Sequence, residues 1–290
     1  MSLKQAIVPA AGLGTRFLPI TKTIPKELIP LGAKACLQHV VDEAVEAGIE
    51  ELIFVISPEK KQIEHYFQPN FRLNAFLKEH GHDGLLNQLQ ELESKARYRF
   101  IYQEEPLGLG HAVNCARKFI DSDYFSVILP DDIVIGDTSV CEQLTQTFEK
   151  YKKPLVSVME VKWEEVHRYG IVRAAALSDS VGEIQDIVEK PKREDSPSNL
   201  AVVGRYILPK SIFDSLDKTP PGAEGEIQLT DALRRLIQKE GLLSYSFQGL
   251  RFDTGEPLGW LKANIAFAVN QSEFREPLLA TMKSLIARYL

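Results

Sequence analysis

The first candidate strand of the chain runs directly into a glycine-containing loop. Residues 5–30 read QAIVPAAGLGTRFLPITKTIPKELIP. The apolar run at 5–8 predicts a short buried strand. The small residues after it, including Gly12 and Gly14, allow backbone N–H groups to approach a phosphate closely. This stretch therefore joins a buried strand to a candidate anion-binding loop.

Three cations follow these glycines. Arg16, Lys22 and Lys26 lie within eleven residues and are opposed only by Glu27. A tight turn with solvated basic side chains would have the same pattern. The dinucleotide fingerprint, however, needs a third glycine where Phe17 stands, and the pattern G-x-x-x-x-G-K-[ST] occurs nowhere in the chain. The loop is therefore suited to a nucleotide, but not to NAD and not in the manner of a P-loop.

Short β-branched runs alternate with helical patterns over the first half of the chain. The expected strands are 5–8, 52–56, 98–103 and 125–129, and the expected helices are 37–47, one that starts at Ser57-Pro58, and 110–119. Gly48 would end the first of these helices, and Ser57 would cap the second. Repeated strand–helix–strand units with largely apolar strands predict a parallel sheet that is covered on both faces.

The pattern changes after about residue 154. Strand-like runs at 155–161, 171–173, 183–188 and 201–208 have fewer helices between them. They predict sheet extensions or antiparallel additions that carry half of the site. Later helices are expected at 227–239 and 259–269, and residues 278–290 predict a terminal amphipathic helix suited to packing or oligomer contacts.

Composition excludes several classes of protein. The chain has 290 residues, of which 44% are hydrophobic, and its net charge of −6 gives no general attraction to nucleic acid or to an anionic membrane. Its longest apolar runs, such as 52–56, are far shorter than the roughly 18 residues of a membrane span. Three widely separated cysteines and the lack of a secretory signal predict a reducing, cytoplasmic location.

The stretch 10–30 closely resembles the amino-terminal motif of the bacterial UTP–glucose-1-phosphate uridylyltransferases, or UDP-glucose pyrophosphorylases. Further motifs of that family follow in order: QEEPLGLGHA at 103–112, LPDD at 129–132, YGIV at 169–172, VEKP at 188–191, AVVGRY at 201–206, GEIQLTD at 225–231 and FDTG at 252–255. The resemblance covers about residues 4–270. It implies an α/β, Rossmann-like nucleotide-diphospho-sugar transferase fold, in which helices flank a mixed, mostly parallel central sheet.

The resemblance also implies how the chain is organised. Residues 1–271 would form a single nucleotidyltransferase domain, with the nucleotide-binding part at about 1–150 and the sugar-binding part at about 151–271. The helix at 272–290 would be a candidate oligomer contact. The family implies one Mg²⁺, the small-molecule substrates UTP and glucose 1-phosphate, and a homo-oligomer, either a dimer or a tetramer. Neither nucleic acid nor a membrane is expected as a partner.

Gln103 is the candidate residue for recognising the base. It follows a strand at the carboxyl end, where ligands bind in open α/β sheets, and its amide offers both a donor and an acceptor to the edge of uracil. A capping glutamine would look the same. Glycines 108 and 110 would permit close approach of the base. The nucleotide-binding set that the resemblance implies is Ala10, Ala11, Gly12, Gly14, Glu27, Gln103, Gly108 and Asp132.

Asp131 and Asp132 stand where the strand 125–129 ends. Mg²⁺ takes one or two carboxylates together with phosphate oxygens and water, so an acid here could meet a bound phosphate. By resemblance, Asp131 is the first metal ligand and Asp253 the second. Adjacent acids on an extended segment point in opposite directions, so Asp131 and Asp132 cannot ligate equally. Which of the two is the main ligand stays open, and the other would cap a helix or support the site from behind.

Glu189 and Lys190 end another expected strand. The resemblance implies that Glu189 binds sugar hydroxyls, that Lys190 holds the sugar phosphate, and that the backbone at Gly170 and Gly204 lies against the glucose ring. A solvated lysine beside a proline would give the same local sequence. The nearby Lys192 is expected to be such a surface residue.

The implied reaction is UTP + α-D-glucose 1-phosphate ⇌ UDP-glucose + pyrophosphate, by in-line attack of the sugar phosphate on the α-phosphorus. Because the second pKa of a phosphate is about 6, the nucleophile is mostly dianionic at pH 7 and needs no general base. His111 is therefore expected to make a packing or capping hydrogen bond. The implied catalytic residues are Arg16, Lys26, Asp131 and Lys190, which would hold and neutralise the reacting phosphates.

Three other functions share parts of this pattern. A sugar-1-phosphate nucleotidyltransferase that uses dTTP would keep the same loop and metal acids. A weakly active homologue that binds sugar nucleotide in a regulatory complex would keep the fold, although the complete set of candidate residues argues against it. A nicotinamide-dependent dehydrogenase is the generic α/β alternative, and Phe17 disfavours it.

Overall fold

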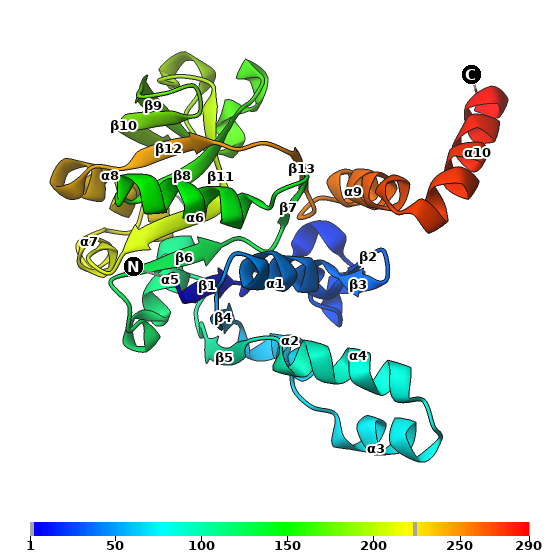
Figure 1. Ribbon diagram of the computed structural model, residues 1–290. Helices are drawn as coiled ribbons and strands as arrows, with labels where there is room; N and C mark the ends of the chain where they lie inside the picture. The colour runs from blue at the N-terminus through cyan, green and yellow to red at the C-terminus, as the bar shows by residue number, and fades with distance from the viewer. Residues whose placement is uncertain (1–2, 223–224, 290) are drawn as a thin grey trace.

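A computed structural model describes residues 3–222 and 225–289, and within them a nine-stranded mixed sheet has the order β5-β4-β1-β6-β11-β8-β12-β10-β9 (Figure 1). Its strands are β1 (Gln5–Pro9), β4 (Glu51–Ile56), β5 (Arg97–Tyr102), β6 (Tyr124–Ile128), β8 (Leu155–Glu160), β9 (Gly170–Ala176), β10 (Val181–Glu189), β11 (Leu200–Pro209) and β12 (Leu243–Ser246). Seven of these nine strands run in one direction, and β10 and β11 run against them. The expected mixed, mostly parallel sheet is confirmed.

The strands β5, β4, β1 and β6 form the parallel half of the sheet, and apolar side chains alternate between its two faces. On β4, Leu52, Phe54 and Ile56 belong to one buried cluster, whereas Ile53 and Val55 belong to the other. Helices α1 (Cys36–Glu46), α2 (Lys61–Phe67) and α6 (Val140–Tyr151) cover the first face, and α5 (Leu109–Cys115), α7 (Ile212–Leu216) and α8 (Leu229–Glu240) cover the second. Both faces are covered, as the apolar strands predicted.

The second half of the sheet contains the predicted additions β8, β9, β10 and β11, together with β12, which was not predicted from the sequence. Strand β11 pairs antiparallel with β6 and with β8, and β10 pairs antiparallel with β9 and with β12. Strand β9 also pairs with β11, so this half of the sheet curls back on itself. The middle of β11 lies beside the carboxyl end of β6, and the curl brings the start of β9 and the end of β10 to the same region.

Two small sheets lie outside the central one. Strands β2 (Pro30–Leu31) and β3 (Lys34–Ala35) form a hairpin, and β7 (Asp132–Ile135) pairs antiparallel with β13 (Leu250–Asp253). In the second sheet Asp132 is the register partner of Asp253. The sequence analysis predicted neither β7 nor β13, and their pairing brings together acids that are more than a hundred residues apart.

Several helix boundaries differ from the expectation. Helix α5 ends at Cys115 and a 3-10 turn follows at Arg117–Phe119, where a single helix was expected to residue 119. Ser57 stands before a 3-10 turn at Pro58–Lys60 that leads into α2, but its side chain makes no capping hydrogen bond. Gly48 does follow α1 with a φ of 89°, as a helix-ending glycine requires.

Four helices extend away from the sheet. Helices α3 (Phe71–Glu79) and α4 (Asp83–Ser94) form a hairpin on one side, and α9 (Pro257–Asn270) and α10 (Ser272–Tyr289) form an arm on another (Figure 1). Helix α10 begins at Ser272, the first residue of the expected C-terminal segment 272–290 and six residues before the amphipathic pattern that starts at 278. It includes Pro277, and Leu290 lies outside the described residues. Among the described helices, none combines the length and the apolar character of a membrane span.

Candidate active site

The carboxyl ends of the parallel strands meet at two adjoining cavities. One of about 280 Å³, here called the loop cavity, is lined by the loop after β1, by Gln103 after β5 and by the turn after β6. The other, of about 370 Å³, here called the strand cavity, is lined by the start of β9, the end of β10, the middle of β11 and part of β13. Leu109, Leu129 and Asp131 line both cavities. Asp131 therefore stands at their junction.

Gln103 is buried at the wall of the loop cavity, and its orientation is fixed by two acceptors. Its Nε2 donates to the carbonyl oxygen of Gly108 over 3.2 Å and faces Nδ1 of His111 at 2.9 Å. Its Oε1 accepts no hydrogen bond from the described residues. The expected packing hydrogen bond of His111 is confirmed, and Gln103, which lines the loop cavity, keeps Oε1 as an acceptor without a partner among the described residues.

The glycines after Gln103 make room for another segment of the chain. Gly108 has a φ of 95°, and a Cβ atom on it would lie 2.8 Å from Cβ of Glu226. A Cβ on Gly110 would lie 2.7 Å from the carbonyl oxygen of Ile227, to which the Gly110 N–H donates. That these glycines also let the base approach closely stays a prediction. They admit the segment before α8, and Gly108 still lines the cavity through its backbone.

The glycine loop is exposed and is fixed mainly at its two ends. Gly12 has open space around it, and Gly14, with a φ of 68°, accepts a hydrogen bond of 2.8 Å from the Thr21 hydroxyl at its carbonyl oxygen. Ala10 and Ala11 are buried where the loop leaves β1. Backbone groups of the loop are thus accessible in front of a rigid strand end.

Lys60 is a buried cation that the sequence analysis did not identify. Its Nζ donates to both carboxylate oxygens of Glu27, at 2.9 and 2.8 Å, and to the carbonyl oxygen of Ala10 at 2.8 Å. Burial lowers the pKa of Lys60, and the charge of Glu27 only partly offsets this. The carboxylate of Glu27, expected to bind nucleotide, is instead paired with Lys60. The position of Lys60 just after β4, beside the end of β1, is the signal that could have found it.

Lys26 and Asp131 form an ion pair across the junction of the two cavities. Nζ of Lys26 lies 2.6 Å from Oδ2 of Asp131. Burial would lower the pKa of Lys26, but the charges of Asp131 and Glu27 outweigh it and raise that pKa. Burial would likewise raise the pKa of Asp131, but Lys26 lowers it below its usual range. Both groups are therefore charged at neutral pH.

Asp132 points the other way, as expected for adjacent residues on an extended segment. Its Oδ1 accepts from Nε of Arg251 at 2.6 Å, and its Oδ2 accepts from the Gly204 N–H at 3.1 Å. A Cβ on Gly204 would lie 2.5 Å from that same Oδ2. Arg251 is in turn held by the Tyr169 hydroxyl at 3.0 Å. Asp132 also lines the strand cavity, but both of its carboxylate oxygens are engaged by protein, whereas Asp131 lines both cavities.

Asp253 is held beside Asp131 by the end of β13. The Thr254 N–H and hydroxyl donate to the carbonyl oxygen of Asp131 at 2.8 and 3.0 Å. A Cβ on Gly255 would lie 2.9 Å from Oδ2 of Asp131 and 3.0 Å from Oδ1 of Asp253, so these two oxygens are at most 5.9 Å apart. Burial raises the pKa of Asp253 in spite of Arg251, and the charge of Asp131 adds to the rise. The glycine therefore leaves a small gap between two mutually repelling carboxylates.

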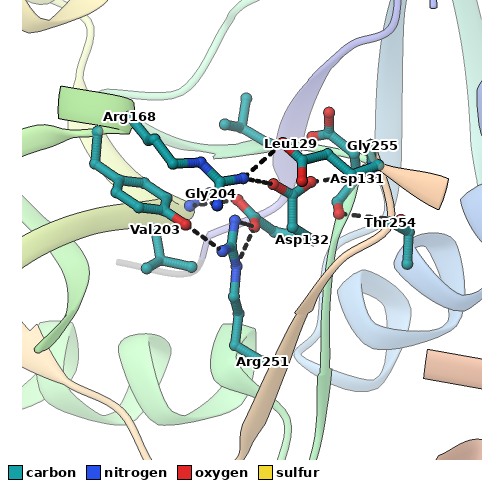
Figure 2. A network of polar contacts seen from close by, with 12 residues as sticks. Leu129, Asp131, Asp132, Arg168, Val203, Gly204, Arg251, Thr254 and Gly255 are labelled. Atoms are coloured by element: carbon teal, nitrogen blue, oxygen red, sulfur yellow. Dashed lines mark hydrogen bonds and ion pairs between the residues drawn. The ribbon is translucent and has the colours of Figure 1, made fainter. Parts of the chain in front are cut away.

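Arg168 and Arg251 approach the acidic residues from two different elements (Figure 2). Nη2 of Arg168 lies 3.1 Å from Oδ2 of Asp253 and 2.6 Å from Oε1 of Glu256. That same Glu256 oxygen lies 3.6 Å from Nη1 of Arg16. The sequence analysis did not identify Arg168 or Arg251, because the fold brings them to the acids from distant segments.

The expected sugar-binding residues lie together in the strand cavity. Oε2 of Glu189 accepts from the Thr230 hydroxyl at 2.6 Å, and a Cβ on Gly170 would lie 3.2 Å from that carboxylate oxygen. Lys190 follows with a φ of 44°, and its Nζ is 3.9 Å from Oε1 of Glu189. Its side chain is 55% exposed and lines the cavity. Lys190 is therefore a cation free to meet an anion there.

No group of three or more His, Cys, Asp or Glu side chains within residues 3–222 and 225–289 is placed to hold a metal. Asp131 and Asp253 alone could offer two carboxylates. Two carboxylates are enough for Mg²⁺, which takes few protein ligands and completes its coordination shell with phosphate oxygens and water.

Comparison with known proteins places the chain in a known family. The family model described as nucleotidyl transferase matches residues 5–269. The chain is 42% identical to a UTP–glucose-1-phosphate uridylyltransferase of Bacillus subtilis (strain 168), over 98% of this chain and 97% of that protein. It is also 42% identical to a protein of the same name from Staphylococcus epidermidis, over 98% of each chain.

Solved structures agree as well. A UDP-glucose pyrophosphorylase in complex with UDP-glucose is 41% identical, with a TM-score of 0.84 over 93% of this chain and all of that one. A UTP-bound UGPase from Acinetobacter baumannii is 38% identical, with a TM-score of 0.88 over 99% of this chain and all of that one.

Proposed function

The chain belongs to the nucleotidyl transferase family, among the UTP–glucose-1-phosphate uridylyltransferases, and we propose that it catalyses UTP + α-D-glucose 1-phosphate ⇌ UDP-glucose + pyrophosphate. The observation that carries the proposal is the position of Asp131, paired with Lys26, where the loop cavity joins the strand cavity. Two anionic substrates that occupied the two cavities would meet there.

The loop cavity would hold the uridine. The free Oε1 of Gln103 can accept a hydrogen bond from N3–H of uracil, and Ala11 and Gly12, which line the same cavity, could donate to the base from their backbone N–H groups. Cytosine has an acceptor at N3, so Gln103 would meet it with a second acceptor. We therefore assign the nucleotide to the part of the chain at about 1–150 and the sugar to about 151–271, in one domain that ends near residue 271.

Cations from both parts of the chain would neutralise the negative charge of the phosphates. Lys190 would hold the attacking phosphate of glucose 1-phosphate, while Arg16 and Lys26 would neutralise the triphosphate and the departing pyrophosphate. The strand cavity would take the glucose ring against the backbone at Gly170, with Glu189 accepting from sugar hydroxyls. No base is needed, because the attacking phosphate is already charged at pH 7.

Asp131 and Asp253 would hold one Mg²⁺. The gap in front of Gly255 and the repulsion between the two carboxylates fit a small divalent cation. When bound, the ion would supply Lewis-acid stabilisation of phosphate oxygens. Asp132, whose carboxylate is taken by Arg251 and the Gly204 N–H, would support the site from behind rather than bind nucleotide.

The cysteines and the last helix bear on where the protein works and on how its copies associate. A cytoplasmic location is supported by the three cysteines, Cys36, Cys115 and Cys141, which are all free. A homo-oligomer that pairs through α10 is supported by the apolar side chains that this helix exposes.

A substrate panel tests the reaction directly. Pyrophosphate release would be measured with glucose 1-phosphate and each of UTP, dTTP, CTP and ATP. We expect UTP to give the highest kcat/KM and CTP to be at least about a hundredfold poorer, because a mismatched buried polar edge is strongly rejected. A preference for dTTP would indicate a thymidylyltransferase instead, and no turnover with any nucleotide would indicate a binding protein.

A further inference from the structure

Each of the two proposed metal acids is paired with a protein cation. Lys26 lies 2.6 Å from Asp131, and Arg168 lies 3.1 Å from Oδ2 of Asp253. The other oxygen of Asp253 accepts the Gly255 N–H at 3.0 Å. A metal in the gap in front of Gly255 would meet Oδ1 of Asp253 while Arg168 holds Oδ2, so two positive charges would share one carboxylate and oppose each other.

Arg168 is placed so that it can leave Asp253 without leaving the site. It ends the 3-10 segment Trp163–Arg168 and lines the strand cavity together with Lys190. Its side chain is 32% exposed, so it is not locked in the core. Its stronger contact, at 2.6 Å, is with Glu256, which also lies 3.6 Å from Arg16. Glu256 thus keeps two guanidinium groups at the mouth of the cavities.

We propose that Arg168 is the resting counter-ion of Asp253, and that it transfers to a substrate phosphate when a divalent metal takes its place. The inference rests on the proposed metal site. A guanidinium and a divalent cation repel each other when both contact one carboxylate. The substrate phosphates would then offer Arg168 a new anionic partner in place of Asp253. Arg168 would then be a catalytic residue beyond those that the sequence motifs identified.

The proposal makes metal and phosphate binding interdependent. Without nucleotide, Arg168 occupies Asp253 and metal binds weakly. With nucleotide, the phosphates attract both the metal and the released guanidinium, so phosphate binding favours metal binding and metal binding favours phosphate binding. The transfer is a movement of a side chain between two anions and requires no proton or bond to change.

Mn²⁺ titration of the unliganded protein, followed by electron paramagnetic resonance, tests the resting state. We expect Arg168→Gln to bind Mn²⁺ about tenfold more tightly than the unchanged protein, because a competing charge is gone. Arg168→Lys keeps that charge and should retain weak binding. Arg193→Gln is the matched control, because Arg193 forms an exposed ion pair with Glu164 outside both cavities. A gain in affinity cannot come from partial unfolding, and unchanged or weaker binding in Arg168→Gln would overturn the proposal.

Steady-state kinetics test the transfer. Arg168→Gln should raise KM by at least about fivefold for the substrate whose phosphate receives Arg168. A higher KM for glucose 1-phosphate would identify the sugar phosphate as the group that receives Arg168. A higher KM for pyrophosphate in the reverse reaction would identify the leaving group instead. Unchanged KM for both would contradict the transfer. If the unchanged protein turns over UTP yet binds no Mn²⁺ even with UTP present, the proposed metal site is wrong and the inference fails with it. If it binds Mn²⁺ with UTP and Arg168→Gln changes nothing, the inference alone fails.

Discussion

Asp131 and Asp132 are neighbours in sequence but have opposite surroundings. Asp131 faces both cavities and pairs with Lys26, whereas Asp132 is buried against Arg251 and the Gly204 N–H. We expect Asp131→Asn to lower the rate of pyrophosphate release by more than about a hundredfold, beyond the usual effect of a supporting residue. We expect Asp132→Asn to act mainly on folding, lowering the free energy of unfolding by about 3 kcal/mol, because it leaves Arg251 buried without its partner.

Rates and urea unfolding of the two variants would be measured side by side. Asp179→Asn, in an exposed turn, controls for the loss of one acid. An active, destabilised Asp131→Asn together with an inactive, stable Asp132→Asn would reverse the two assignments.

The cations of the site divide into those that local sequence can identify and those that it cannot. Arg16 and Lys26 stand in one loop with Gly12 and Gly14, so their pattern is visible in the sequence. Arg168 and Arg251 are ordinary arginines at the ends of a 3-10 segment and a four-residue strand, and only the fold brings them to the acids. Side chains recruited over such distances leave no local signal.

Local sequence also identifies some strands of the fold and not others. Strands β1, β4, β5 and β6 were predicted because each is a largely apolar run in a repeated strand–helix unit. Strands β7 and β13 have four residues each, and their pairing joins segments more than a hundred residues apart. Propensity cannot identify so short a strand, because its stability comes from its partner. The pairing that sets Asp253 beside Asp131 was therefore not predicted, although both acids were.

A buried ion pair joins α1 to β11 beneath the site. Glu43 accepts from Nε and Nη2 of Arg205 at 3.0 and 2.6 Å, and Arg205 donates to the carbonyl oxygens of Leu129 and Asp132 at 3.1 and 2.8 Å. Arg205 is 1% exposed. The pair thus fixes the turn that carries Asp131.

We expect Glu43→Gln to lower the free energy of unfolding at pH 7 by about 3 kcal/mol, because Arg205 stays charged and buried. Burial would raise the pKa of Glu43, but Arg205 lowers it below the ordinary 4.5. The unfolded chain therefore binds the proton first, so this part of the stability is present above about pH 4.5 and is lost as the pH falls through the folded pKa. Chemical denaturation between about pH 5 and pH 3 should thus be less pH-dependent in Glu43→Gln.

Glu46→Gln is the matched control for that measurement. Glu46 is on the same helix but exposed, and it forms no ion pair with the described residues. An equal loss of stability in both variants, or an unchanged pH dependence in Glu43→Gln, would contradict the assigned role of the pair.

At the scale of the whole molecule, α10 stands apart from the body, whereas α9 packs beside β2 and buries Ala263 in the core (Figure 1). On α10 the apolar residues Phe274, Leu278, Met282, Leu285 and Tyr289 follow at spacings of four, four, three and four. These positions fall on one side of a helix, and no residue of α10 is buried within the described chain. Such a stripe suits pairing with the same stripe of a second copy about a two-fold axis.

Replacing Leu285 on this stripe should separate the copies. The side chain is 49% exposed, so Leu285→Glu costs the monomer little, yet it would put two carboxylates into the shared apolar seam. By light scattering after size exclusion, we expect the unchanged protein at twice the chain mass of 32.6 kDa or a larger even multiple, and Leu285→Glu at a smaller multiple. Ala287→Glu adds the same charge on the opposite side of α10 and should leave the mass unchanged. A monomeric unchanged protein, or an equal effect of both substitutions, would rule out this stripe as the contact between copies.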